Sequence, residues 1–316
     1  MAPLPLLVAG PFVDVDGTIA ISAMPLLSGG LILHITHETV YRYSEPVLLS
    51  PHLLYLRPRE TSRQRIRRYN LQISPIPNYS KTMDPLENEL WHARFPTPTT
   101  ELSVRSDLEV ETRDTNPFDF VLEDYAVESP FTYDPVLAFA LAPYLMPPFD
   151  DTQDELRAWV TRTFLDRPKN PLAMLHAFCR VLHGELKYER REAPGIQTSI
   201  ETLRRGQGAC RDFAVLFTEL CRTLGLAARY VSGYIGSAQG DEKVADNAMH
   251  AWAEVYLPGA GWKGIDPTNG IWCDDRFVAV AHGAQAESVN PIQGAFSNAN
   301  PVQTELSVKV TVDAIL

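Results

Sequence analysis

Residues 206–214 read Gly206-Gln207-Gly208-Ala209-Cys210-Arg211-Asp212-Phe213-Ala214, and this stretch organises the rest of the chain. From Phe213 onward apolar residues recur at the spacing of three and four that is typical of an amphipathic helix, up to Leu224. Gly225 then supplies a C-terminal stop. Cys210 is therefore expected at a helix N-terminus, where free backbone N–H groups and the positive end of the helix dipole favour a thiolate.

Length and composition indicate a globular protein with two domains. The chain has 316 residues, of which 45% are hydrophobic, and this is enough for more than one core. Its net charge of -11 argues against binding to nucleic acid or to an anionic membrane surface. No apolar run reaches the about 18 residues that a membrane-spanning helix needs, so we expect no membrane partner.

Cysteine usage argues against a disulfide scaffold or a metal site. The four cysteines are Cys179, Cys210, Cys221 and Cys273. They are few for a chain of this length and lack CxxC spacing, so we expect four reduced thiols, no metal and no cofactor. The acidic residues Asp241, Glu242 and Asp246 do not have the spacing of a calcium loop.

The first 30 residues are interpreted as an N-terminal extension. Their apolar run lacks a positively charged start and is broken by prolines, so it does not resemble a signal peptide, and we expect a cytoplasmic protein. Met24 precedes the first strand-like pattern and is an alternative start, which would make residues 1–23 an upstream addition.

Residues 31–149 are predicted to form an all-β, sandwich-like domain followed by a proline-rich linker. β-branched and aromatic residues with partial alternation mark strands at 31–41, 47–56, 63–74, 88–95 and 101–113. No segment between them keeps helical spacing, and the linker prolines follow from Pro130 to Pro148. The linker is expected to be well packed rather than flexible.

A basic run from Arg57 to Arg68 stands out in an acidic protein. It contains Arg57, Arg59, Arg63, Arg65, Arg67 and Arg68. One interpretation is a docking patch for an acidic partner, and the other is a solvated face that protects a strand edge.

Residues 150–316 are predicted to form an α+β domain that ends in a further strand. Helices are expected from Asp150, at 171–185 and at 199–203, in addition to the one that begins at Cys210. After Gly225 the pattern changes to strands at 227–235, 249–257 and 262–266, with a polar loop at 236–248 and a last strand at 304–312. The result is a β-meander packed behind a helix.

Cys210, His250 and Asp266 can share one site if the helix lies across this meander. A thiol nucleophile needs a base to take its proton, and the base needs a carboxylate to orient it and to stabilise the imidazolium. For His250 and Asp266 to lie on one face of an antiparallel pair, paired residue numbers must have an even sum. A symmetric two-residue turn on Gly259-Ala260 gives an odd sum, so we predict a bulge or an odd-length loop near 258–261.

Three separated motifs match one family in order. They are Gly-Ala-Cys-Arg-Asp-Phe-Ala (208–214), His-Ala-Trp-Ala-Glu-Val-Tyr (250–256) and Gly-Trp-Lys-Gly-Ile-Asp-Pro-Thr (261–268). Together they resemble the transglutaminase-like superfamily, whose core is a papain-like α+β fold with a Cys-His-Asp triad. The run at 37–47 resembles the N-terminal domain of its bacterial members. The resemblance implies Cys210 as nucleophile, His250 as general base and acid, and Asp266 as the residue that orients it.

Further site residues are expected around this triad. Candidates for holding the acyl oxyanion are Gln207 and Tyr188, beside the backbone N–H of Cys210. Candidates for lining the cleft are Trp252, Glu254 and Trp262, although a tryptophan is more often part of the core. Asp212 is interpreted as a cap or dipole partner of the helix, and not as a catalytic acid.

The expected function is thiol-based acyl transfer on a peptide or protein substrate. Release of the acyl group to water makes a peptidase or amidase, and release to a lysine-type amine makes a crosslinking transglutaminase. Both outcomes use the same triad, and hydrolysis is favoured because no secretion signal is evident. A binding module with an inactive triad is the alternative from a different class.

Overall fold

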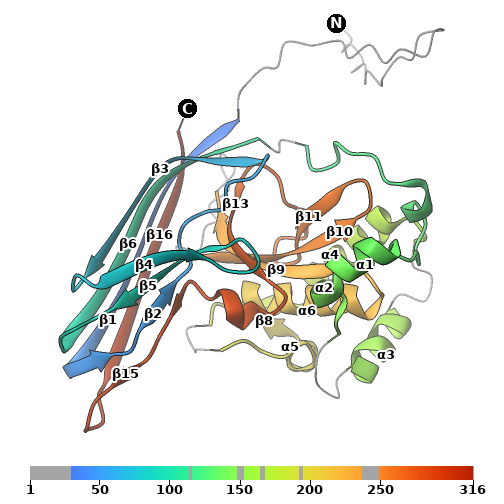
Figure 1. Cartoon of the computed structure of the whole chain (residues 1–316). Coiled ribbons are helices and arrows are strands. Elements are labelled where there is room, and N and C mark those ends of the chain that lie inside the picture. Colours follow the sequence, from blue (N-terminus) through green and yellow to red (C-terminus); the bar gives the residue numbers. More distant parts are fainter. Residues whose placement is uncertain are drawn as a thin grey trace, which may run out of the picture.

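The computed structural model describes residues 30–113, 116–147, 153–163, 168–191, 195–236 and 249–315 (Figure 1). The expected N-terminal extension and most of the polar loop at 236–248 lie outside the described residues, and so do the acidic residues Asp241, Glu242 and Asp246.

The N-terminal region is a sandwich of two antiparallel sheets. Its own strands are β1 (Leu31–Leu49), β2 (His52–Leu54), β3 (Gln64–Ser74), β4 (Asn78–Met83), β5 (Glu89–Arg94) and β6 (Thr99–Thr112). Three strands from the end of the chain complete it: β14 (Ile292–Gln293), β15 (Phe296–Ser297) and β16 (Thr304–Ile315). One sheet has the order β15-β1-β6-β3 with β16 also on β1, and the other has the order β14-β2-β5-β4.

The long strand β1 carries the alternation that the sandwich needs. Its residues Leu33, Ile35, His37 and Thr39 are buried, and the residues between them are partly exposed. Farther along, Val47 packs with side chains of β2, β5 and β6 in a core between the two sheets. The predicted strand at 47–56 is in fact divided between the end of β1 and β2.

The C-terminal strand corrects the expected domain organisation. We expected it to accompany the α+β domain, but β16 pairs antiparallel with β1 from Ile32↔Ile315 to Tyr43↔Thr304. Alternation at 304–315 shows that a strand forms and does not show which sheet receives it. The described end of the chain therefore belongs to the N-terminal sandwich.

The α+β region consists of helices packed on a five-stranded antiparallel sheet of order β12-β11-β10-β9-β13. Its helices are α3 (Gln153–Thr163), α4 (Pro171–Glu185), α5 (Ser199–Arg205) and α6 (Cys210–Thr223). Its strands are β7 (Lys187–Tyr188), β8 (Gln207–Gly208), β9 (Ala228–Ile235), β10 (His250–Leu257), β11 (Gly261–Asp266), β12 (Ile271–Trp272) and β13 (Phe277–Gly283). The helices expected at 171–185 and from Cys210 are confirmed.

Helix α6 is the central element of this region, and it packs against β9 and β10 (Figure 1). Phe213, Leu216, Phe217 and Leu220 are buried on it, as their spacing predicts. Phe217 and Leu220 join side chains of α4 and of the sheet in one apolar cluster. The helix therefore fixes Cys210, at its first residue, relative to the sheet.

The described part of the proline-rich linker packs on the α+β region through Tyr133, Leu141 and Tyr144, whereas its Val136 and Phe139 are exposed. It contains the short helices α1 (Pro135–Ala140) and α2 (Ala142–Leu145), and the short helix η1 (Asp124–Ala126) precedes it. The hydroxyl of Tyr133 donates to the carbonyl of Tyr256 at 2.8 Å and accepts from the N–H of Ala227 at 3.0 Å. These bonds hold the linker against β9 and β10.

The sandwich and the α+β region share a continuous interior. Leu33, Leu108 and Val312 of the first sheet lie in one apolar cluster with Tyr234 and Val278 of the second region. A short helix, η2 (Ala286–Val289), contributes to the same cluster. No helix in the described part of the chain is long and apolar enough to cross a membrane.

Candidate active site

Cys210 begins α6, as its sequence context predicts. Ala209, the residue before it, has an extended backbone (φ -85°, ψ 172°) and no side chain that can cap the helix. Asp212 takes that role from the first turn, because its Oδ2 accepts from the N–H of Ala209 at 2.8 Å. The expectation that Asp212 acts as a cap is confirmed.

The register of β10 and β11 brings His250 and Asp266 together. Ala253 pairs with Ile265 and Leu257 with Gly261, so paired numbers have an even sum and a three-residue loop joins the strands. The predicted odd-length loop is therefore confirmed. His250 and Asp266 lie on one face, and Nε2 of His250 is 2.8 Å from Oδ2 of Asp266.

The carboxylate of Asp266 is buried and fully surrounded by donors. Oδ2 accepts from Asn269 Nδ2 at 2.6 Å in addition to His250, and Oδ1 accepts from the N–H of Thr268 at 2.9 Å. Burial would raise the pKa of Asp266, but His250 and these hydrogen bonds hold it below its usual value. Asp266 therefore remains a carboxylate.

His250 is held in its charged form. Burial alone would lower the pKa of His250, but the Asp266 carboxylate and the Cys210 side chain raise it from 6.5 to about 10. Cys210 lies near enough to His250 to contribute to this shift. Because Nε2 of His250 is hydrogen-bonded to Asp266, Nδ1 is the ring nitrogen left for the thiol. The imidazole and the carboxylate thus form a hydrogen-bonded pair, with Cys210 nearby.

The other three cysteines differ from Cys210. All four are free, in agreement with the prediction of reduced thiols. His250 lies near Cys210, whereas burial raises the pKa of Cys179, Cys221 and Cys273. They are therefore suited to the thiol form.

The three expected cleft residues lie on the same face of the sheet as His250. The Trp252 ring lies beside the imidazole with 6.3 Å between centroids, and it is almost fully buried. Trp252, Glu254 and Trp262 line a cavity of about 360 Å³ together with Arg229, which binds Glu254 and lies over the Trp262 ring. Among described residues, the lining of this cavity does not include Cys210, His250 or Asp266.

The two oxyanion candidates lie close to the start of α6. β7 and β8 form a parallel pair in which Tyr188 is opposite Gly208. Gln207, on β8, donates one amide N–H to Glu189 Oε2 at 2.9 Å. Both therefore flank the segment that leads into Cys210, and their contact with an oxyanion stays a prediction.

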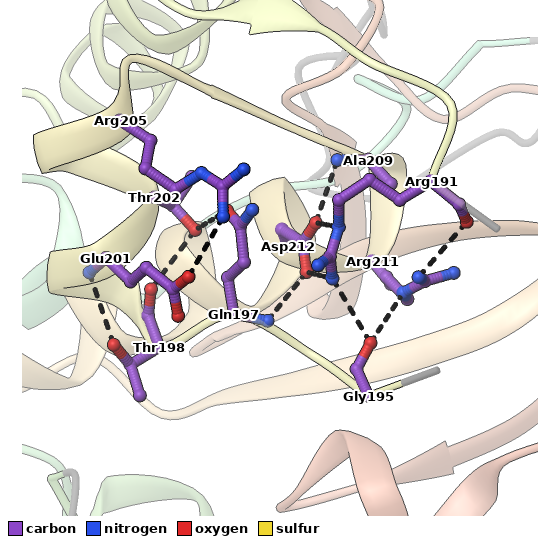
Figure 2. A network of polar contacts seen from close by, with 10 residues as sticks. All are labelled: Arg191, Gly195, Gln197, Thr198, Glu201, Thr202, Arg205, Ala209, Arg211 and Asp212. Carbon is purple, nitrogen blue, oxygen red and sulfur yellow. Dashed lines mark hydrogen bonds and ion pairs between the residues drawn. The ribbon is translucent and has the colours of Figure 1, made fainter. Parts of the chain in front are cut away.

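Two polar partners of the site were not identified from the sequence. Asn269 follows Asp266 by three residues, and this short spacing in a Pro-containing turn was the available signal. Arg191 donates two hydrogen bonds to Asp212, both 3.0 Å long (Figure 2). It lies 21 residues before Asp212, and α5 and β8 come between them, so no local pattern indicates the pairing.

Carboxylates of β5 and β6 pair with three of the six arginines of the basic run. Arg67 pairs with Glu111, Arg68 with Asp107 and Glu109, and Arg57 with Glu89 of β5. A register shift between Ile66 and Arg68 interrupts the alternation expected for Arg63, Arg65 and Arg67. Docking of an acidic partner there stays a prediction.

The fold and the Cys-His-Asp grouping define a papain-like α+β protein that is joined to a β-sandwich. Residues 33–111 match the bacterial transglutaminase-like N-terminal region, and residues 159–267 match the transglutaminase-like superfamily. The chain belongs to the transglutaminase-like superfamily.

Relatives match over most of the chain. The uncharacterized protein Rv2569c of Mycobacterium tuberculosis is 31% identical, and the match covers 90% of this chain and 94% of the relative. The uncharacterized protein ML0607 of Mycobacterium leprae is 24% identical over 88% of this chain and 98% of its own length. A crystal structure of a candidate cysteine protease from Cytophaga hutchinsonii has a TM-score of 0.72 at 19% identity, over 91% of this chain and 92% of that one. This last likeness establishes the fold.

Proposed function

We propose that this protein is a thiol acyl-transfer enzyme in which Cys210 is the nucleophile, His250 the proton carrier and Asp266 the group that orients it. The observation that carries the proposal is the 2.8 Å contact between His250 and Asp266, with Cys210 among the groups that raise the pKa of the same imidazole. A raised pKa keeps the proton on His250 near neutral pH, and an imidazolium is the kind of partner that activates a cysteine nucleophile.

The proposed acylation step uses each of these groups once. The Cys210 thiolate attacks the carbonyl carbon of a peptide or carboxamide bond and forms a tetrahedral intermediate. The backbone N–H of Cys210 supports the oxyanion, with Gln207 or Tyr188 as a second donor. His250 then gives its proton to the nitrogen, the C–N bond breaks, and an amine leaves a thioester on Cys210.

Deacylation returns the enzyme to its starting state. Neutral His250 takes a proton from water as its oxygen attacks the thioester carbon, and the thiolate leaves. We favour water as the acceptor, which makes the protein a peptidase or amidase, and the description of its structural neighbour as a candidate cysteine protease accords with this choice. A lysine-type amine in place of water would give protein crosslinking.

The first test is selective alkylation of the four cysteines by iodoacetamide near neutral pH, read by mass spectrometry. Cys210 is expected to react well before Cys179, Cys221 and Cys273, and His250→Ala is expected to remove this preference. Equal labelling of all four residues in the folded protein would exclude the enzyme and would favour an inactive binding module.

The second test identifies the acyl donor and the acceptor. The protein is incubated with a peptide library, and thioesters on Cys210 are detected by mass spectrometry. Repeating the incubation with a primary amine separates the two outcomes: free acid products support hydrolysis, and an amide of the added amine as the main product supports crosslinking.

A further inference from the structure

The carboxylate of Asp212 is fully buried, and four donors hold it. Oδ2 accepts from the N–H of Ala209 at 2.8 Å and from Nε of Arg191 at 3.0 Å. Oδ1 accepts from the N–H of Gln197 at 2.8 Å and from Nη2 of Arg191 at 3.0 Å. Figure 2 shows Asp212 between these partners. The two parallel hydrogen bonds from the Arg191 guanidinium fix the orientation of the Asp212 carboxylate as well as its distance from Arg191.

This arrangement immobilises the peptide unit that precedes the thiol. The N–H of Ala209 is held by the Asp212 side chain, and the carbonyl of Ala209 accepts from the N–H groups of Asp212 and Phe213 at 3.0 and 3.1 Å. The N–H of Cys210 belongs to the same peptide unit as that carbonyl. Its direction, and the position of the Cys210 side chain, therefore depend on Asp212.

A second consequence concerns the segment beside the thiol. The carbonyl of Gly195 accepts from Arg191 Nη2 at 3.2 Å and from Arg211 Nε at 3.0 Å. With the N–H of Gln197 bonded to Asp212, both neighbours of Ile196 are held. Ile196 packs into the same apolar cluster as Cys210, so this network also fixes an apolar residue in the surroundings of Cys210.

Charge gives Arg191 a further role. An unpaired Asp212 carboxylate on the first turn of α6 would oppose a thiolate on Cys210, because the two negative charges lie on one turn of helix. Arg191 offsets that carboxylate, and its own side chain is only 15% exposed. The positive end of the α6 dipole is then left to act on Cys210.

We propose that Arg191 and Asp212 are a positioning pair for Cys210: they set the direction of its backbone N–H, hold Ile196 against its cluster and balance the charge on the first turn of α6. The inference rests on the proposed function, because it assigns these residues to the same reaction. Neither residue contacts the reacting atoms, so both act through Cys210.

The test compares three variants with the wild-type chain. Arg191→Gln removes the positive charge and both guanidinium hydrogen bonds to Asp212. Arg191→Lys keeps the positive charge but cannot form the two parallel hydrogen bonds. Arg204→Gln is the matched control. Arg204 makes an exposed ion pair with Glu155 on the neighbouring helices, outside this network. The rate constant for iodoacetamide alkylation is measured at each cysteine by mass spectrometry.

We expect Arg191→Gln to slow alkylation of Cys210 at least about tenfold, because small displacements of a reacting group are costly. Arg191→Lys should recover part of the rate, Arg204→Gln should match wild type, and Cys179, Cys221 and Cys273 should stay protected throughout. A purely structural role predicts a different pattern, in which the buried Cys179 and Cys221 become labelled and Cys210 reacts as fast as before or faster.

Two results overturn the inference and are distinguishable from failure of the proposed function. If wild-type Cys210 shows labelling that depends on His250, but both Arg191 variants keep the wild-type rate, only the positioning role is wrong. If the buried cysteines open in Arg191→Lys as well, the pair is structural only. Absence of selective labelling in the wild-type protein would instead refute the proposed function, and this inference with it.

Discussion

Replacing Asp266 with Asn should lower the pH at which the His250 ring loses its proton. A rise of the His250 pKa from 6.5 to about 10 stabilises the imidazolium, and this is worth on the order of 5 kcal/mol. Asp266 is the principal favourable partner, and Cys210 contributes the rest. Asn keeps the shape and one acceptor oxygen but removes the charge. The pKa of His250 is therefore expected to fall by about 1 to 3 pH units.

The direct measurement is a pH titration of the ring nitrogens by NMR on protein labelled with ¹⁵N-histidine. His250→Gln identifies the signal among the 8 histidines of the chain. In the wild-type protein the His250 signals should remain those of an imidazolium up to about pH 10. In Asp266→Asn they should change to those of a neutral ring at much lower pH.

The same shift has a consequence for stability. Because the folded-state pKa of His250 lies above its unfolded value, the folded protein holds an extra proton between pH 6.5 and about 10. The stabilisation is complete below pH 6.5 and is lost as the pH rises through that window. The free energy of unfolding in urea should therefore fall between pH 7 and 10 for the wild-type protein. For Asp266→Asn it should change less over the same range.

The control is Asp274→Asn, which removes a carboxylate that binds Arg276 next to the same sheet. It should leave the His250 titration unchanged. The reasoning is refuted if wild-type His250 titrates near 6.5, or if Asp266→Asn leaves its titration where it was.

Three further changes test the packing around the site. Gly208→Ala should lower the free energy of unfolding in urea by about 1–3 kcal/mol, because a Cβ there would lie 3.0 Å from the Asp212 Cβ. Gly184→Ala is the control: its Cβ meets no atom within 4 Å, and alanine should stabilise helix α4 slightly. Phe217→Ala should cost about 3–5 kcal/mol by the same measurement, because the ring is fully buried between α6, α4 and the sheet. Deletion of residues 304–316 should leave β1 with an unpaired edge, and the shortened protein should aggregate, as measured by light scattering. A shortened protein that is monomeric and unfolds cooperatively would contradict this.

Local patterns in the sequence were sufficient for the elements that carry Cys210, His250 and Asp266. The apolar spacing after Cys210 predicts the buried face of α6, and Cys210 lies at the start of that helix. The parity of residue numbers in β10 and β11 was enough to predict an odd-length loop, because side chains alternate strictly along a strand. His250 and Asp266 could therefore be paired before the fold was known.

Features that depend on contacts between distant segments were not predictable in the same way. The alternation of β16 indicates a strand, yet its partner β1 lies at the other end of the chain, and both candidate sheets offer an apolar face. Arg191 is similar: an arginine in a charged loop usually faces solvent, and only the buried carboxylate of Asp212 gives it a partner. Sequence periodicity predicts which face of a strand or helix is buried, but it does not predict which other segment packs against that face.

The pairing of β1 with β16 also bears on the order in which the chain folds as it is synthesised. About 250 residues separate the end of β1 from the start of β16. At synthesis rates of about 5 to 20 residues per second, one edge of β1 stays without β16 for roughly 10 to 50 s. β6 can cover the opposite edge much earlier. The sandwich thus emerges first and is completed last, so we expect the nascent chain to depend on chaperones until its final strand leaves the ribosome.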